Sequence, residues 1–194
     1  MKSEFGFESD SFVILMIASF EKRKRIEDAI QGFIEANLPN AYLLLVGSLG
    51  NSDEYSKAVV ELAKKHPQIC IFNVTSELDK FYSVADIFLF TSEKETYPLV
   101  LQESSYYLLP RVVAKFPGYE ECVNVNSAVL FEIGDINSIS KLIRAIYLGE
   151  IDVKGISQVA KSDTDSKAKK FSTNIAGIQN YLEDFQVSTE VISS

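Results

Sequence analysis

Two carboxylates and a run of cations are the residues of this sequence whose spacing could do chemistry. Glu95 and Glu103 stand on either side of Pro98, which is suited to the first position of a helix. The four consecutive cations at residues 22–25 stand at the expected start of another helix, where the macrodipole disfavours positive charge. An anionic ligand would resolve that conflict, and so would a solvated patch balanced by neighbouring carboxylates.

The positions of the two carboxylates fit a phosphate ligand that carries hydroxyl groups on both sides. The N–H groups at the start of a helix after Pro98 form a ready site for a phosphate. A rise of about 1.5 Å per residue places Glu103 about 7.5 Å along the axis, past a diphosphate and level with a ribose. Glu95 would repel phosphate unless it faces other hydroxyls, which a sugar would supply. The bland alternative is a pair of ordinary exposed carboxylates.

The elements that must position these residues follow from the apolar pattern. Solid apolar runs mark strands covered on both faces, and helical spacing of apolar residues separates them. The expected strands are residues 12–18, 42–46, 69–74, 86–90, 111–114 and 128–131. The expected helices are residues 24–36, 53–63, 78–84, 98–108 and 135–148. This alternation predicts an α/β fold, a doubly wound parallel six-stranded Rossmann-like sheet with right-handed crossovers.

The fold class itself predicts where a ligand binds. In the common strand order 3-2-1-4-5-6, the ligand crevice lies at the carboxyl ends of strands one and four. The loops at residues 19–24 and 91–98 follow those two strands. We therefore expect the cations and Glu95 to meet at one edge of the sheet.

Charge and motifs exclude several classes of protein. Nineteen Lys and Arg against 27 Asp and Glu leave a net charge of −8, which argues against general nucleic-acid binding. The sequence lacks the Gly-x-Gly-x-x-Gly and Walker patterns, so dinucleotide and P-loop sites lose support. A flavodoxin-like receiver would need an acidic cluster after the first strand, and cations stand there instead.

The cysteines and the apolar runs indicate the compartment. Cys70 and Cys122 have no metal-ligand spacing and fit two thiols in a reducing cytoplasm, with no metal expected. Residues 1–10 lack the features of a signal peptide, and no apolar run approaches the ~20 residues of a membrane-spanning helix. We expect a cytoplasmic protein without a membrane-spanning segment.

Composition shifts along the chain suggest its domain limits. We expect residues 1–11 to be disordered or a linker, and residues 12–150 to form the Rossmann-like domain. A C-terminal helical extension is expected at residues 151–185, and a frayed tail at residues 186–194.

Several segments together resemble the C-terminal, donor-binding half of the family 4 (group 1) retaining glycosyltransferases of the GT-B fold. The family signature Glu-x7-Glu corresponds to Glu95 and Glu103, after an Ala-Asp-hydrophobic strand at residues 85–90. Residues 17–24 are similar to the family's glycine-arginine-leucine…lysine loop, and residues 110–121 to its Pro-Val-Val-Ala…Gly-x-x-Glu segment. The resemblance covers about residues 12–148 and implies that the domain expected at residues 12–150 is a nucleotide-sugar-binding domain.

The resemblance implies a role for each matching residue. Lys24 and Glu95 are the expected catalytic residues, since Lys24 would meet the donor diphosphate and Glu95 the transferred sugar, while Glu103 would hold the ribose. The other expected donor-binding residues are Ser19, Arg23, Tyr97, Leu99 and Val100, and the base would be lined by the backbone near Ile71, Phe72 and Asn73. Ser19 replaces the family's arginine, for which Arg23 is a possible substitute, and Thr96-Tyr97-Pro98 replaces a Gly-Phe-Gly turn.

The family relationship also implies an activity and a partner. Its members transfer a hexose-type sugar from a nucleotide diphosphate sugar, here a UDP-sugar or a GDP-sugar, to an acceptor hydroxyl with retention, usually without metal. An acceptor-binding domain normally precedes the first strand seen here, so the expected partner is that N-terminal domain. The chain alone should then bind the donor and transfer little. A non-catalytic nucleotide-binding or protein-interaction module is the alternative.

Overall fold

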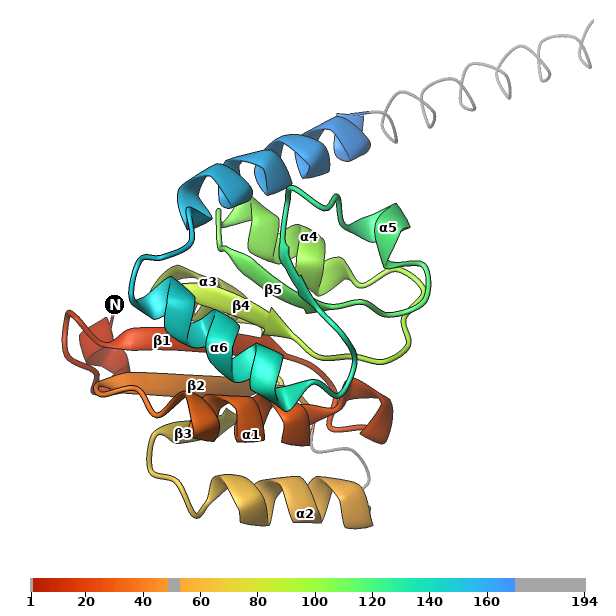
Figure 1. Ribbon diagram of the computed structural model, residues 1–194. Coiled ribbons are helices and arrows are strands. Elements are labelled where there is room, and N and C mark those ends of the chain that lie inside the picture. The colour runs from red at the N-terminus through yellow and green to blue at the C-terminus, as the bar shows by residue number, and fades with distance from the viewer. Residues whose placement is uncertain (1, 49–52, 170–194) are drawn as a thin grey trace, which may run out of the picture.

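Six parallel strands form one sheet in the order β3-β2-β1-β4-β5-β6 in the computed structural model, which describes residues 2–48 and 53–169 (Figure 1). The strands are β1 (Phe12–Ile17), β2 (Ala41–Val46), β3 (Ile69–Phe72), β4 (Ile87–Phe90), β5 (Arg111–Ala114) and β6 (Val129–Phe131). This is the predicted order, with β1 paired to β4 at the point where the order reverses. The predicted doubly wound α/β fold is therefore confirmed.

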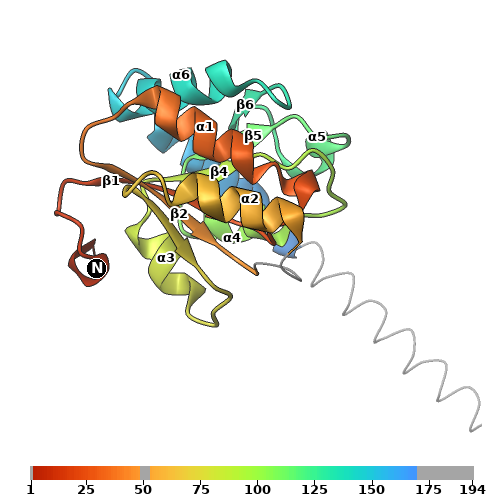
Figure 2. The same cartoon turned by 90° about the horizontal axis from the view of Figure 1, so that it is seen from below.

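Helices cover both faces of the sheet, as Figure 2 shows from below. One face carries α1 (Ile26–Ala36), α2 (Glu54–Ala63) and α6 (Ile136–Tyr147). The other carries α3 (Leu78–Val84), α4 (Leu99–Tyr106) and the one-turn α5 (Tyr119–Cys122). Short 3-10 helices form at η1 (Lys2–Phe5) and η2 (Lys22–Lys24). Among residues 2–48 and 53–169, no helix combines the length and apolarity needed to cross a bilayer.

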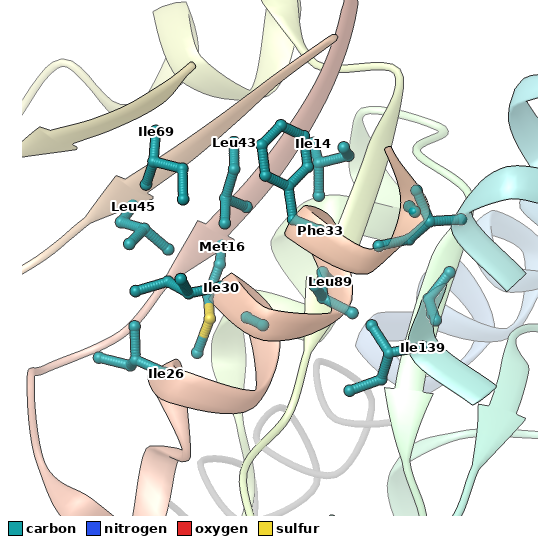
Figure 3. Packing of buried hydrophobic residues seen from close by; sticks show 14 of the residues in the cluster. Ile14, Met16, Ile26, Ile30, Phe33, Leu43, Leu45, Ile69, Leu89 and Ile139 are labelled. Atoms are coloured by element: carbon teal, nitrogen blue, oxygen red, sulfur yellow. The ribbon is translucent and has the colours of Figure 1, made fainter. Parts of the chain in front are cut away.

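Successive side chains of the strands point to opposite faces of the sheet and pack into two separate hydrophobic cores. Ile14 and Met16 of β1 pack under α1 against Ile30 and Phe33, and Ile139 of α6 completes this cluster (Figure 3). The residues between them on β1 pack into the cluster on the opposite face. Burying each such aliphatic side chain stabilises the fold by about 1.5–3 kcal/mol. Both faces are apolar because both are covered, which is why the strands read as solid apolar runs.

A glycine lets the carboxyl ends of β1 and β2 approach each other. A Cβ placed on Gly47 would lie 1.8 Å from the carbonyl oxygen of Ala18, so a side chain at this position would collide with backbone. Just beyond this contact, the N–H of Phe20 donates to the carbonyl of Ser48 at 2.8 Å. The close approach therefore helps to set the start of the loop after β1.

The prediction that residues 1–11 are disordered or a linker is wrong for residues 2–11. Phe7 is buried and stacks on Tyr42 with ring centroids 4.1 Å apart. Phe5 meets Phe72 edge-on at 5.8 Å. These aromatic contacts remove apolar surface from water, which offsets the entropy lost when the segment is ordered.

A further helix covers α4 and α5. Residues 153–169 are helical and lie across these two elements, in blue in Figure 1. Thr164 donates to the amide oxygen of Gln102 at 2.9 Å, and the Lys167 ammonium donates to the Glu121 carbonyl at 2.9 Å. Polar contacts on its flank thus tie this helix to the domain.

The described residues include only part of the C-terminal segments that the sequence predicts. The helix at residues 153–169 falls within the helical extension predicted for residues 151–185. The remainder of that extension and the tail predicted at residues 186–194 lie outside the described residues. The domain limit at residue 150 stays a prediction.

Candidate functional site

Two loops that are far apart in the sequence meet at the carboxyl ends of β1 and β4. The Thr91 hydroxyl donates to the carbonyl of Lys24 at 2.8 Å. The N–H of Glu93 donates to the carbonyl of Arg23 at 2.9 Å. These bonds join the loop after β4 to the cation run after β1, so the expected meeting of the two loops is confirmed.

The cation run lies before α1 and not in its first turn. The prediction of a helix from residue 24 is wrong by two positions, since Lys22–Lys24 form η2, Arg25 is left-handed with φ of 50°, and α1 begins at Ile26. The first turn of α1 holds acidic residues, which the macrodipole favours. Tyr55 of α2 completes this helix start, because its hydroxyl accepts the N–H of Ile26 at 2.9 Å.

Carboxylates of the chain itself balance much of the positive charge. The Arg25 guanidinium donates to Asp28 at 2.6 Å and to Glu93 at 3.4 Å. The hydrogen bond to Asp28 is the main reason why the pKa of Arg25 lies above its usual value. Arg25 is therefore committed to these carboxylates and holds the start of α1 against the loop after β4.

Glu95 lies at the centre of the remaining cations. Its Oε1 accepts from the ammonium of Lys24 and, at 3.2 Å, from the guanidinium of Arg23. The side chains of Glu95 and Lys24 are only 10% and 13% exposed. Water therefore screens this pair less than a surface pair. The structure brings together the two residues predicted to be catalytic, and it joins them to each other.

Ser19 reaches this group through a residue that sequence reasoning did not select. Its hydroxyl donates to Oε1 of Glu21 at 2.6 Å, and the Nε of Arg23 donates to Oε2 of Glu21 at 2.8 Å. The hydrogen bonds from Ser19 and then from Arg23 lower the pKa of the Glu21 carboxyl. Glu21 thus orients Arg23 toward the loop after β4, where the guanidinium contacts the Lys94 carbonyl and Glu95.

The start of α4 is open to solvent. Pro98 is the N-cap and not the first helical residue as predicted, because its ψ of 102° is extended. Its side chain makes no capping hydrogen bond, so the N–H groups of Leu99 and Val100 face no cap. Tyr97 and Leu99 are 50% and 64% exposed. This is the arrangement in which a helix terminus binds an anion.

Glu103 is held by a tyrosine from α3. The hydroxyl of Tyr82 donates to Oε2 of Glu103 at 2.6 Å. Tyr82 is 2% exposed, and its ring stacks on Tyr107 with centroids 4.9 Å apart. Burial and the bond to Glu103 raise the pKa of Tyr82, so the phenol keeps its proton and remains a donor at neutral pH. The sequence analysis did not select Tyr82 as a site residue, because spacing along the chain does not show which residues of two different helices meet. The one available signal was a tyrosine on the apolar face of the predicted helix at residues 78–84.

The end of β3 offers backbone more than side chains to a base. Ile71 packs into the core on the α1 side of the sheet and Phe72 into the core on the α3 side. The strand ends at Phe72 and not at residue 74 as expected, and the side chain of the exposed Asn73 accepts the N–H of Val74 at 2.8 Å. The predicted lining by backbone near these residues is compatible with this geometry.

The hollows beside the helix at residues 153–169 lie away from the predicted site. Two hollows of about 430 and 490 Å³ run beside the helix at residues 153–169, and neither is lined by a residue predicted to bind the donor. Within the described part of the chain, no three His, Cys, Asp or Glu side chains are grouped so as to hold a metal ion. Of the residues predicted to bind the donor, Tyr97 and Leu99 are exposed, whereas Lys24 and Glu95 are nearly buried.

A parallel sheet whose strand order reverses between β1 and β4, with helices on both faces, defines an α/β protein of the Rossmann-like class. Residues 1–171 match the family model described as "Glycosyl transferases group 1", and the chain belongs to that family. Its Rossmann-like sheet corresponds to one half of a GT-B glycosyltransferase.

Curated relatives come from several bacteria. The chain is 28% identical over 116 residues to the alpha-monoglucosyldiacylglycerol synthase of Acholeplasma laidlawii, covering 58% of this chain and 29% of that protein. It is 26% identical over 145 residues to the N-acetyl-alpha-D-glucosaminyl L-malate synthase of Bacillus anthracis, covering 72% of this chain and 37% of that protein. The chain thus spans about a third of the length of these relatives.

Solved structures share the fold. The Anabaena HepE protein, solved with UDP and glucose, superposes with a TM-score of 0.80 at 16% identity over 91% of this chain and 51% of its own. The sucrose-phosphate synthase of Thermosynechococcus elongatus superposes with a TM-score of 0.78 at 17% identity, over 93% and 48%. The described domain matches about half of each of these chains.

Proposed function

We propose that this chain is the donor-binding half of a retaining glycosyltransferase that moves a hexose-type sugar from a nucleotide diphosphate sugar to an acceptor hydroxyl. The observation that carries the proposal is the convergence of Lys24, Arg23 and Glu95 at the switch point of the sheet. Membership of the group 1 family supports the reaction class.

The predicted site residues bind different parts of the donor. Lys24 and Arg23, with the N–H groups of Leu99 and Val100, bind the diphosphate and stabilise the charge that grows on it as the sugar leaves. Glu95 accepts hydrogen bonds from hydroxyls of the transferred sugar. This arrangement needs no protein nucleophile, because the task of the chain is positioning and electrostatic stabilisation.

The nucleoside end is bound farther from the cations. Glu103 accepts hydrogen bonds from the ribose hydroxyls, and Tyr82 fixes its carboxylate by occupying Oε2. The base lies against the backbone at the end of β3. UDP-sugars and GDP-sugars are the two donor classes proposed, and the HepE complexes with UDP and with UDP-glucose favour the first.

A second domain belongs to this proposal. An acceptor-binding domain faces the open edge of the sheet, where Tyr97 and Leu99 are exposed, and supplies the other wall of the cleft. The chain covers 51% of the HepE chain, which fits this division. We expect a metal-free reaction, since the cations of the chain meet the diphosphate, and a reducing cytoplasm, since Cys70 and Cys122 are both unpaired.

Two observations favour a non-catalytic nucleotide-binding or protein-interaction module instead. Lys24 and Glu95 satisfy each other's charge, as a purely structural ion pair would. Residues 96–98 also replace the family's Gly-Phe-Gly turn with bulkier side chains. Nucleotide binding with no transfer, even after an acceptor domain is supplied, would establish this alternative.

The experiment is a calorimetric titration of the chain with UDP, GDP and their glucose conjugates, with and without Mg²⁺. We expect saturable binding of one base, unchanged by Mg²⁺ and weakened at least tenfold by Lys24→Ala and by Glu103→Ala. Lys64→Ala is the matched control, because Lys64 pairs with Glu61 on the surface of α2. A flat titration with folded protein would overturn donor binding, and vigorous transfer by this chain alone would overturn its assignment as half of an enzyme.

A further inference from the structure

The ion pairs of Glu95 with Lys24 and Arg23 bear on which ligand the site binds more tightly. We propose that Glu95 competes with the donor diphosphate for Lys24 and Arg23, and thereby makes the site discriminate against the nucleoside diphosphate product in favour of the nucleotide sugar. This inference rests on the proposed function and concerns the specificity of the same site.

The competition follows from the contacts of a single oxygen. Oε1 of Glu95 accepts from both the Lys24 ammonium and the Arg23 guanidinium. A phosphate oxygen that binds these cations competes with Oε1 for them, because two anions at one ammonium repel each other. At 10% exposure, the Glu95 carboxylate has little water to replace the partners it loses.

The second cation keeps a different partner during this exchange. Arg23 also binds Glu21 through its Nε at 2.8 Å, and Glu21 is 48% exposed. Arg23 can therefore turn one N–H from Glu95 to a phosphate without leaving Glu21. The cost of the exchange falls mainly on Glu95, which is left buried beside an anion.

The sugar of the donor is what compensates that cost. Sugar hydroxyls donate to a displaced carboxylate, and hydrogen bonds to a charged group are stronger than neutral ones. A nucleoside diphosphate has no such hydroxyls at this position. Glu95 therefore penalises the product more than the donor, which favours departure of the product after transfer.

The test compares binding of inorganic pyrophosphate, UDP, UDP-glucose, GDP and GDP-glucose by the wild-type chain and by Glu95→Gln. The glutamine keeps the shape and the hydrogen-bonding oxygen but removes the charge. Glu93→Gln is the matched control, because Glu93 lies two positions earlier in the same loop and pairs with Arg25. Thermal unfolding checks each variant, and Glu95→Ser replaces the glutamine variant if it does not fold.

We expect Glu95→Gln to bind pyrophosphate and the preferred nucleoside diphosphate about tenfold more tightly, because the anion no longer has to displace an ion pair. The size of the effect lies between the values typical of exposed and of buried ion pairs. Binding of the matching sugar conjugate should change by less than about threefold, since the gain from removing the competition is offset by the weaker hydrogen bonds of a neutral amide to the sugar hydroxyls. Glu93→Gln should change neither. In a Lys24→Gln background, most of the tightening should vanish, because the contested cation is gone.

The outcomes separate this inference from the proposed function. If the nucleotides bind and Glu95→Gln is no tighter for the diphosphate than the wild type, the competition is wrong and donor binding stands. If Glu95→Gln tightens pyrophosphate while no nucleotide binds, the donor role is wrong and the competition stands. Absence of binding by every probe would overturn both.

Discussion

Replacing Tyr82 with phenylalanine tests whether Glu103 is held for a ligand. Tyr82→Phe removes one hydroxyl, and with it the 2.6 Å bond to Oε2 of Glu103. The ring is 2% exposed and keeps its stacking on Tyr107, so phenylalanine fills the same space. The change therefore isolates the hydrogen bond from the packing.

The magnitude follows from the charge and exposure of the acceptor. A hydrogen bond to a charged group contributes about 1.5–3 kcal/mol, and a fully buried partner would lose all of it. Glu103 is half-buried, so water replaces part of the bond. We expect the free energy of unfolding to fall by about 1.5 kcal/mol, or about 3–6 °C in Tm for a chain of this size. Nucleotide affinity should fall about fivefold, because the ribose must then order the carboxylate itself.

Urea unfolding and nucleotide titration measure the two effects on the same samples. Tyr107→Phe is the matched control, since it removes the same group from the same ring stack, where the hydroxyl donates to Asp79 at the surface. The control should lose less than about 0.5 kcal/mol and leave nucleotide affinity unchanged. If Tyr82→Phe loses stability but binds nucleotide as the wild type does, Tyr82 supports the fold alone and the positioning argument is refuted.

Three further outcomes are expected. Arg111→Met should lower the free energy of unfolding by about 3 kcal/mol in urea titration, because the buried guanidinium donates to Ser127 at 2.7 and 2.8 Å; a loss below about 1 kcal/mol would contradict this. Phe7→Ala should cost about 3 kcal/mol in the same assay, whereas a linker segment would show no change. The bond to Asp79 raises the pKa of Tyr107 to about 12, so the small stabilisation from this surface bond, below about 0.5 kcal/mol, is present below pH of about 10 and should be lost as pH rises toward 12. Urea midpoints that stay constant over this range would contradict the last prediction.

The strands and their order could be predicted because their cause is local. A strand buried on both faces needs apolar residues at consecutive positions, and the runs beginning at Phe12 and Ile87 show that pattern. Alternation with helices of matching length then leaves few topologies. The edge at which Lys24 and Glu95 meet follows from that topology, before any side-chain contact is known.

Boundaries were less predictable, since they depend on a few competing interactions. Cations at the start of α1 could not be placed from spacing alone, because the left-handed Arg25 and the hydroxyl of Tyr55 decide where the helix begins. The N-terminal segment was misjudged for a related reason. Its acidic, interrupted sequence is typical of a linker, and only the position of Tyr42 provides the surface on which Phe7 packs.

The sequence by itself determined the sheet, its helices and the presence of two carboxylates and a cation run at one edge. These features depend on periodicity and motif spacing, which are set by residues close together along the chain. The tertiary structure alone decided that Glu95 pairs with Lys24 and Arg23, and that Tyr82 holds Glu103. These pairs join loops and helices that are distant along the chain. Their energies depend on burial and on the exact approach of single atoms, which no local pattern encodes.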